Sequence, residues 1–287
     1  MPFKILLLIL VFGMVVRGAF GIVVTRCWPD LAYFAEHAGI VLLFTAMAFA
    51  SILQFNLDRR KIALILGNRL RSREFALALA VAGLLLMFTF GESALFTMAL
   101  AQYSAETAYS LGKYHPHPYA AHPFLSVHVL TFVCSSVILP AIFEEFFFRG
   151  LVFRSFNEHH GFFVSAALTA LMFTLIHPMK TIYVGTFLFS FVLSYLYATT
   201  GSLRPCMVAH AAFNLLAFVN QHYADFHRIR TINELNEWQY WIPQLTMFGI
   251  AVAGFGWLLM SSANAIRHAS IPSLPPPTAY AGKTTAS

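Results

Sequence analysis

The sequence predicts an all-α, polytopic membrane helix bundle of about eight transmembrane helices, with a polar site inside the bundle. Hydrophobic residues make up 59% of the 287 residues, charged residues make up 10%, and the mean hydropathy is +0.69. A soluble domain of this length would have about a quarter of its residues charged. The apolar residues also fall into runs long enough to cross the roughly 30 Å hydrocarbon core of a bilayer.

Eight apolar runs are predicted to be transmembrane helices. They cover residues 3–24, 38–57, 75–100, 125–148, 162–177, 182–199, 205–219 and 241–260. The fifth and seventh runs are short for a full span, so we expect them to be tilted, partly re-entrant or joined tightly to their neighbours. The first run begins after a lysine, as a secretory signal does, but it lacks a good cleavage site and is interpreted as an anchor.

The positions of lysine and arginine predict the orientation, because basic residues near helix ends are retained on the cytoplasmic side. With the N-terminus inside, twelve basic residues are cytoplasmic and five are outside. Arg17 lies within the first run and can extend toward an interface. We therefore expect a multi-pass plasma (inner) membrane protein with both termini in the cytoplasm. No nucleic-acid-binding module is recognisable, and attraction to anionic lipid is the simpler use of the positive charge.

The strongest functional signal is an acidic pair followed by an arginine at the end of the fourth apolar run. The segment reads Glu-Glu-Phe-Phe-Phe-Arg-Gly, with Glu144, Glu145 and Arg149 as its charged residues. A charged side chain at the bilayer centre costs about 2.5–3.5 kcal/mol on insertion scales, so such residues indicate a functional site. Glu145 and Arg149 lie four apart, on one helix face, and are predicted to form an ion pair. Glu144 is then the freer carboxylate, suited to a general base near the cytoplasmic face.

Two further apolar segments supply possible partners at the same spacing of four. One contains Phe173 and His177, and the other contains His210 and Asn214. A carboxylate and an imidazole can activate a water molecule, while a second imidazole and an amide can donate hydrogen bonds to an oxyanion. This set favours peptide hydrolysis by an activated water, and His177 is a candidate to share a proton with Glu144.

At these residues the sequence resembles the CPBP family of intramembrane proteases. This family includes the type II CAAX prenyl endopeptidases (Rce1-like) and the bacterial bacteriocin-processing and self-immunity (Abi) proteins. The resemblance covers residues 140–220 and lies in three motifs that occur in family order. The motifs are Glu-Glu-x-x-x-Arg at Glu144, Glu145 and Arg149, Phe-x-x-x-His at Phe173 and His177, and His-x-x-x-Asn at His210 and Asn214.

The resemblance implies a glutamate-dependent, metal-free endopeptidase. Glu144 and His177 would activate the water, and His210 and Asn214 would form the oxyanion hole. Glu145 and Arg149 would organise the site, and Phe173 would shape its wall. The substrate would be a membrane-associated peptide or protein, either prenylated or carrying a leader or sorting segment.

Four regions follow from this interpretation. Transmembrane helices and a His/Pro loop occupy residues 1–124, and the catalytic core occupies 125–220. A polar loop and the last transmembrane helix occupy 221–267, and a disordered tail occupies 268–287. The loop contains His115, His117 and His122, each before a proline, and we interpret it as a solvated loop rather than a metal-binding tract.

Two alternative functions remain open at this stage. Glu144, His177 and His210 could ligate a catalytic zinc ion, because two imidazoles, a carboxylate and an open position suit that metal. The buried charges could instead belong to a transporter or a non-catalytic scaffold. The pair of Glu145 and Arg149 could also be purely architectural, and the phenylalanines could simply pack.

Overall fold

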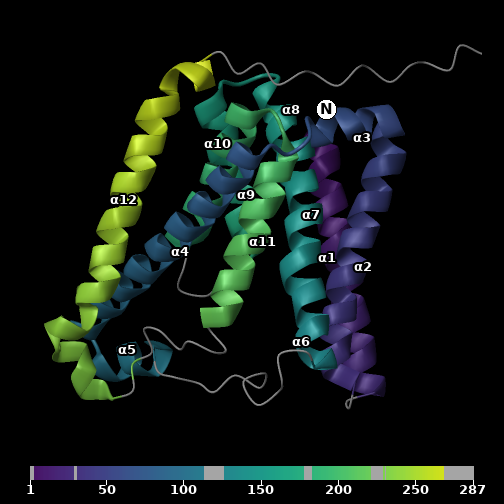
Figure 1. Ribbon diagram of the computed structural model, residues 1–287. Helices are drawn as coiled ribbons and strands as arrows, with labels where there is room; N and C mark the ends of the chain where they lie inside the picture. Colours follow the sequence, from purple (N-terminus) through teal and green to yellow (C-terminus); the bar gives the residue numbers. More distant parts are fainter. Residues whose placement is uncertain are drawn as a thin grey trace, which may run out of the picture.

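The protein is a bundle of membrane-length helices, shown by a computed structural model that describes residues 3–28, 31–112, 126–177, 183–220, 229 and 231–267 (Figure 1). The regular elements in this part of the chain are helices, so the predicted all-α class is confirmed. The tail at 268–287 and the histidines of the His/Pro loop lie outside the described residues. The predicted division into four regions stays a prediction.

The described part of the chain contains twelve α-helices. The α-helices are α1 (Phe3–Cys27), α2 (Ala32–Phe55), α3 (Arg59–Leu66), α4 (Ser72–Ala101), α5 (Ala105–Gly112), α6 (Val127–Phe132), α7 (Leu139–Glu145), α8 (Arg154–Asn157), α9 (Phe162–Ile176), α10 (Tyr183–Thr200), α11 (Leu203–Val219) and α12 (Trp238–Arg267). Two π-helical segments, Val133–Ile138 and Phe146–Phe153, join α6, α7 and α8, and a 3₁₀ turn covers Ile232–Asn236.

Five of these helices are long and apolar enough to cross a membrane, and three shorter apolar helices accompany them. The shorter helices are Phe162–Ile176, Val184–Thr200 and Leu203–Val219. Together they account for the eight predicted runs. The prediction that the fifth and seventh runs are short is confirmed, since α9 has 15 residues and α11 has 17.

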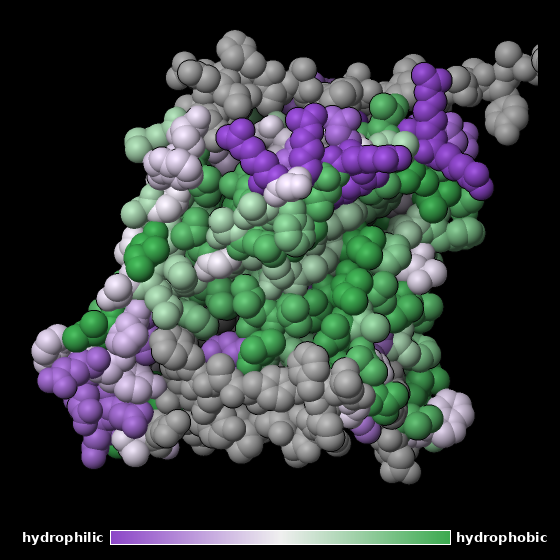
Figure 2. All heavy atoms as spheres, in the orientation of Figure 1, coloured by the Kyte–Doolittle hydropathy of each residue, from purple (hydrophilic) through white to green (hydrophobic). Residues whose placement is uncertain are grey.

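The outer surface is the one expected of a protein in lipid. Large apolar side chains are exposed on the outward faces of the long helices, including Leu8 (67%), Phe49 (62%) and Trp257 (65%). Figure 2 shows an apolar band across the face drawn, with polar side chains gathered toward both ends. Such a band would be unstable in water and is stable against hydrocarbon. The chain is an integral membrane protein.

The ends of the helices divide between two sides of the bundle. The start of α1, the helices α3 and α8 and the end of α12 lie at one end, while α5 and α6 lie at the other (Figure 1). The first end carries the exposed arginines Arg59, Arg60, Arg69, Arg71 and Arg73. This placement of the helix ends agrees with the predicted order in which the helices cross the membrane. The assignment of the basic end to the cytoplasm stays a prediction.

The fourth span differs from the prediction in a way that moves the site. We expected it to end at Phe148, with the glutamates near one membrane face, but the helix continues to Asn157. Phe147, Phe148, Leu151, Val152 and Phe153 are buried among the other helices, so this stretch extends the span within the core. Glu144 lies 13 residues before the helix end, which is about 20 Å at 1.5 Å per residue. The glutamates therefore lie near mid-depth in the bundle.

The basic end of the bundle is closed by a tight contact between α3 and the turn before α11. Gly67 ends α3 with φ of +72°, and a Cβ atom there would lie 2.3 Å from the carbonyl oxygen of Gly201. Ser202 Oγ lies 3.1 Å from Leu66 O and 3.0 Å from Asn68 O, so its hydroxyl is shared by these two carbonyls. Only glycine fits position 67, because both its backbone conformation and the surrounding space exclude a side chain.

We expect Gly67→Ala to lower the free energy of unfolding by more than about 1 kcal/mol, because alanine meets both strain and a clash there. The measurement is the thermal unfolding midpoint of the purified protein in detergent. Gly83→Ala is the matched control, since Gly83 lies within α4 and a Cβ there would meet nothing within 4 Å. An unchanged midpoint for Gly67→Ala would contradict the packing described for this end.

Candidate active site

The site is built on one long helix that twice changes from α-helical to π-helical hydrogen bonding and back. Val127–Asn157 is a continuous span, and its α-helical part α7 lies between the two π-helical segments. Glu144 and Glu145 end α7, and Arg149 lies in the second π-helical segment. Wider π-helical turns are rare in proteins and occur often at functional sites. Here they flank the two acidic residues that the sequence singles out.

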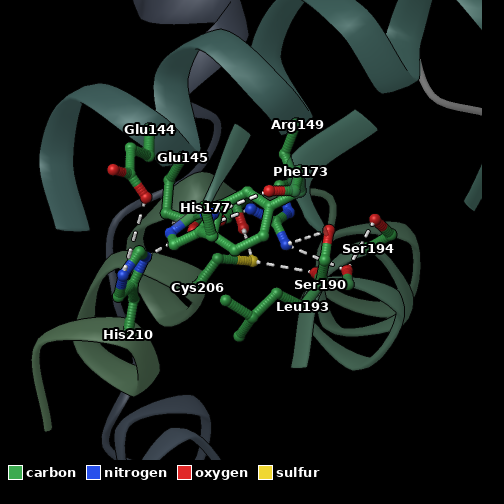
Figure 3. Close-up of polar contacts among 11 residues, drawn as sticks. Glu144, Glu145, Arg149, Phe173, His177, Ser190, Leu193, Ser194, Cys206 and His210 are labelled. Atoms are coloured by element: carbon green, nitrogen blue, oxygen red, sulfur yellow. Dashed lines mark hydrogen bonds and ion pairs between the residues drawn. The ribbon is translucent and has the colours of Figure 1, made fainter. Parts of the chain in front are cut away.

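Glu145 is the centre of a buried network of charged and polar groups (Figure 3). Its Oε1 atom lies 2.9 Å from Arg149 Nη1 and 2.7 Å from His210 Nδ1. The side chains of Glu145 and Arg149 are both 0% exposed. The predicted ion pair is therefore present, and His210 joins it as a second partner on the same oxygen.

Arg149 extends the network to two further helices. Its Nη2 atom donates hydrogen bonds to the carbonyl oxygen and to the Oγ of Ser190 on α10, both at 2.9 Å. Its guanidinium lies 5.1 Å from the ring centre of Phe173 on α9, within cation–π range. Because a guanidinium has a planar array of donors, it can hold one carboxylate and a second helix at once. Arg149 thus fixes α7 relative to α9 and α10.

Phe173 contacts three side chains of the site, so it does more than fill space. Besides Arg149, its ring lies 4.3 Å from the ring of His177 and 6.3 Å from that of His210, measured between centroids. It is 2% exposed. Phe173 packs against the two histidines without lining either cavity described below, and its role in shaping the wall of the site stays a prediction.

His210 is oriented so that its two nitrogens face the two glutamates. Glu145 Oε1 accepts the hydrogen bond from Nδ1, which leaves Nε2 on the side of Glu144, 3.9 Å from Glu144 Oε2. That separation is too long for a direct hydrogen bond. A water molecule beside both atoms could contact each of them at about 2.8–3.0 Å. The Glu144 side chain is 14% exposed, and its Oε2 has no hydrogen-bond partner in the described part of the chain.

His177 follows the last residue of α9 and is held by the helix it ends. Its Nδ1 lies 2.6 Å from the carbonyl oxygen of Phe173, so Nδ1 carries the proton and Nε2 has a free lone pair. Within the described residues no hydrogen bond joins His177 to Glu144. The imidazole in ion-pair contact with Glu144 is that of His210. The sequence did not predict this contact.

Asn214 is oriented by a proline on the neighbouring helix. Pro140 has no N–H to donate to the carbonyl of Ser136, four residues earlier, and Asn214 Nδ2 donates to that carbonyl at 3.2 Å. One amide hydrogen of Asn214 is thereby fixed. The other hydrogen on the same nitrogen remains available to a ligand.

The predicted catalytic residues meet at one cavity. Glu144, His177, His210 and Asn214 all line a cavity of about 340 Å³ between α2, α7 and α11. A second cavity of about 690 Å³ lies against α1 and α2 and also reaches Glu144 and His177. Arg17, Leu43 and Phe44 line both cavities. Their volumes fall in or near the range of about 300–1,000 Å³ typical of ligand pockets.

The zinc alternative finds no ready site in this geometry. Within the ranges described above, no group of three His, Cys, Asp or Glu side chains is arranged to hold a metal ion. Glu145 contacts both Arg149 and His210, which leaves His210 with one ring nitrogen that Glu145 does not bind. The requirement for a metal stays a question for experiment.

Sequence reasoning missed several polar residues that support the site. Glu92 is a further acidic residue within an apolar span, on α4, and α4 packs against α10 and α11. Ser190 receives Arg149, and Arg17 lines both cavities. A lone acid or base inside an apolar run was the available signal for Glu92 and Arg17, and it is the argument that found Glu144.

Comparison with known protein families gives one match, over residues 126–216, to type II CAAX prenyl endopeptidase Rce1-like proteins. The matched segment is about a third of the chain and contains all three motifs. Comparisons with curated proteins and with solved structures found no match. The chain is therefore an integral membrane protein whose residues 126–216 are similar to the Rce1-like proteins, a membrane protease family, and this is consistent with the CPBP family that its motifs resemble.

Proposed function

We propose that this protein is a glutamic-type intramembrane endopeptidase, which hydrolyses a peptide bond in a membrane-associated or lipid-modified substrate. One observation carries the proposal. Glu144, His177, His210 and Asn214 come from three separate segments and line the same cavity at mid-depth in an apolar bundle. Chance placement of four such groups in apolar surroundings is energetically disfavoured. The similarity of the segment that contains them to the Rce1-like proteins supports a protease at the level of the family.

The proposed chemistry begins with a water molecule between Glu144 and an imidazole. Glu144 accepts a proton from the water while the oxygen attacks the carbonyl carbon of the substrate. His177 presents its free Nε2 to the cavity and assists in orienting the water. The C–N bond then breaks, and Glu144 returns the proton to the leaving amine. Arg149 binds the carboxylate of Glu145 and not that of Glu144. Glu144 is therefore the carboxylate suited to exchange a proton.

The proposed oxyanion hole consists of His210 and Asn214. Asn214 has one amide hydrogen bound to Ser136 O and one available. His210 donates from Nε2 when that atom carries a proton, and Glu145 at Nδ1 can balance the positive charge of the ring. Donors fixed before the reaction stabilise a developing oxyanion more than mobile water does, and the loss of one such donor costs about 10²–10³ in rate.

The proposed substrate approaches from the membrane or from the basic end of the bundle. The cavity walls include α1 and α2, which lie outside the segment that matches the Rce1-like proteins. We propose a peptide that is prenylated or carries a leader or sorting segment, cleaved in a plasma (inner) membrane with both termini of the enzyme in the cytoplasm.

Glu144→Gln is expected to abolish proteolysis, with a loss of at least about 100-fold in rate, because the amide cannot accept the proton of the attacking water. The measurement is a comparison of membrane-protein termini in cells carrying the normal chain, Glu144→Gln or the control Glu106→Gln, which changes an exposed acid on α5. Termini that appear with the normal chain and the control alone would identify substrates. An identical set in all three strains would instead favour a scaffold or a transporter.

We also propose that hydrolysis needs no bound metal. Metal analysis of the purified active protein should then show less than one equivalent of zinc, and activity should survive a strong chelator. Stoichiometric zinc lost together with activity would replace this mechanism by a zinc-dependent one that uses Glu144, His177 and His210.

Pro140→Ala is expected to lower kcat about 10-fold or more with little effect on KM, because the new N–H competes with Asn214 for the carbonyl of Ser136. The matched control is Pro243→Ala, which removes a proline inside α12 and away from the cavity. Equal kinetics for Pro140→Ala and the normal chain would show that Asn214 does not depend on this contact.

A further inference from the structure

Arg17 is a charged residue within the span of α1 that forms no ion pair with another described side chain. It lies ten residues before the end of α1, about 15 Å along the helix axis. The ion pairs of the described residues join Glu145 with Arg149 and His210 with the two glutamates, and none involves Arg17. A guanidinium at this depth is costly without an anion or water beside it.

The side chain of Arg17 faces the catalytic cavities. Arg17 lines both the 340 Å³ cavity and the 690 Å³ cavity, together with Glu144 and His177. Its stem rests against α2, since a Cβ added to Gly39 would lie 3.4 Å from Arg17 Cγ. Gly18 and Gly21 lie on the same wall, with nothing within 4 Å of an added Cβ. The small residues leave open space beside the guanidinium.

The position of Arg17 relative to Glu144 suggests what fills this space. The two side chains share both cavities but form no ion pair, so a ligand can lie between them. The remaining walls are mostly apolar, including Leu10, Met14 and Phe148. A guanidinium in such surroundings matches a carboxylate, which it can bind through two parallel hydrogen bonds.

We propose that Arg17 binds a carboxylate of the substrate close to the scissile bond and thereby selects peptides that carry one. This inference rests on the proposed function, because it takes the cavity at Glu144 as the place of hydrolysis. The carboxylate is either the free C-terminus of the peptide or an acidic side chain near the cleaved bond. A phospholipid headgroup is disfavoured as the anion, since headgroups lie at the membrane surface and Arg17 lies about 15 Å inside its helix.

The test uses purified full-length protein and three internally quenched peptides with a farnesylated cysteine followed by three residues, all of them apolar in the first two peptides. One peptide has a free C-terminal carboxylate, one has a C-terminal amide, and one has the amide with a glutamate among the last three residues. Binding is measured with the Glu144→Gln protein, and cleavage with protein that retains Glu144. Each is compared with Arg17→Gln, Arg17→Lys and the control Arg26→Gln, an exposed arginine of α1 that lines neither cavity.

We expect a carboxylate peptide to bind about 10- to 100-fold more tightly than the plain amide. Arg17→Gln should remove that preference and leave binding of the amide unchanged, Arg17→Lys should restore part of it, and Arg26→Gln should have no effect. The free acid and the glutamate peptide distinguish the two sources of the carboxylate.

Several results would overturn the inference. All three peptides could bind equally, or the preference for a carboxylate could persist in Arg17→Gln. Arg17→Gln could also weaken binding of the acid and the amide peptides by the same factor. Finally, vesicles of anionic phospholipid could displace the acid peptide in a manner that depends on Arg17. Arg17-dependent binding without any Glu144-dependent cleavage would leave the inference standing and count against the proposed function. The two can therefore fail separately.

Discussion

The carboxylate of Glu145 is the interaction on which the rest of the site depends. A single oxygen, Oε1, contacts both Arg149 and His210, and all three side chains are buried. Removing one member of a buried ion pair leaves an uncompensated charge, at a cost of about 3–5 kcal/mol. Glu145 therefore holds the donor on His210 in place, while Arg149 ties the same oxygen to α10 through Ser190. The architectural role of this pair is thus to orient His210 and to join α7 to α10, which is the role that the proposed reaction requires of it.

The helix that carries the glutamates departs from α-helical geometry where the site needs it. Pro140 leaves the carbonyl of Ser136 without its usual donor, and Asn214 supplies one from α11. The π-helical segments on both sides of α7 change the direction in which successive side chains point. The sequence feature behind one of these departures, a proline four residues before Glu144, is visible without any structure.

The parts of the fold that could be predicted from sequence are those set by one helix at a time. Apolar runs predicted the eight helices, and a spacing of four predicted the contact of Glu145 with Arg149, because both depend only on local geometry. The contact of His210 with Glu145 joins residues 65 apart, and no local pattern encodes it. The extension of the fourth span to Asn157 was missed because Arg149 and Arg154 resemble the end of a span. Buried partners, among them Ser190 and Tyr197, make those charges tolerable inside the bundle.

The cavity lies between the segment that matches the Rce1-like proteins and the helices α1 and α2. Its proposed reactive groups belong to the segment that matches the Rce1-like proteins, where His210 and Asn214 are held by partners on a neighbouring helix and His177 is held by its own helix. Its other wall is formed by α1 and α2, where Gly18 and Gly21 leave room, Gly39 packs against the stem of Arg17, and Arg17 supplies a positive charge. A substitution in this wall changes the shape and charge of the space without disturbing the network around Glu145. If the proposed function holds, selection of the substrate can vary through α1 and α2 independently of the groups proposed to carry out hydrolysis.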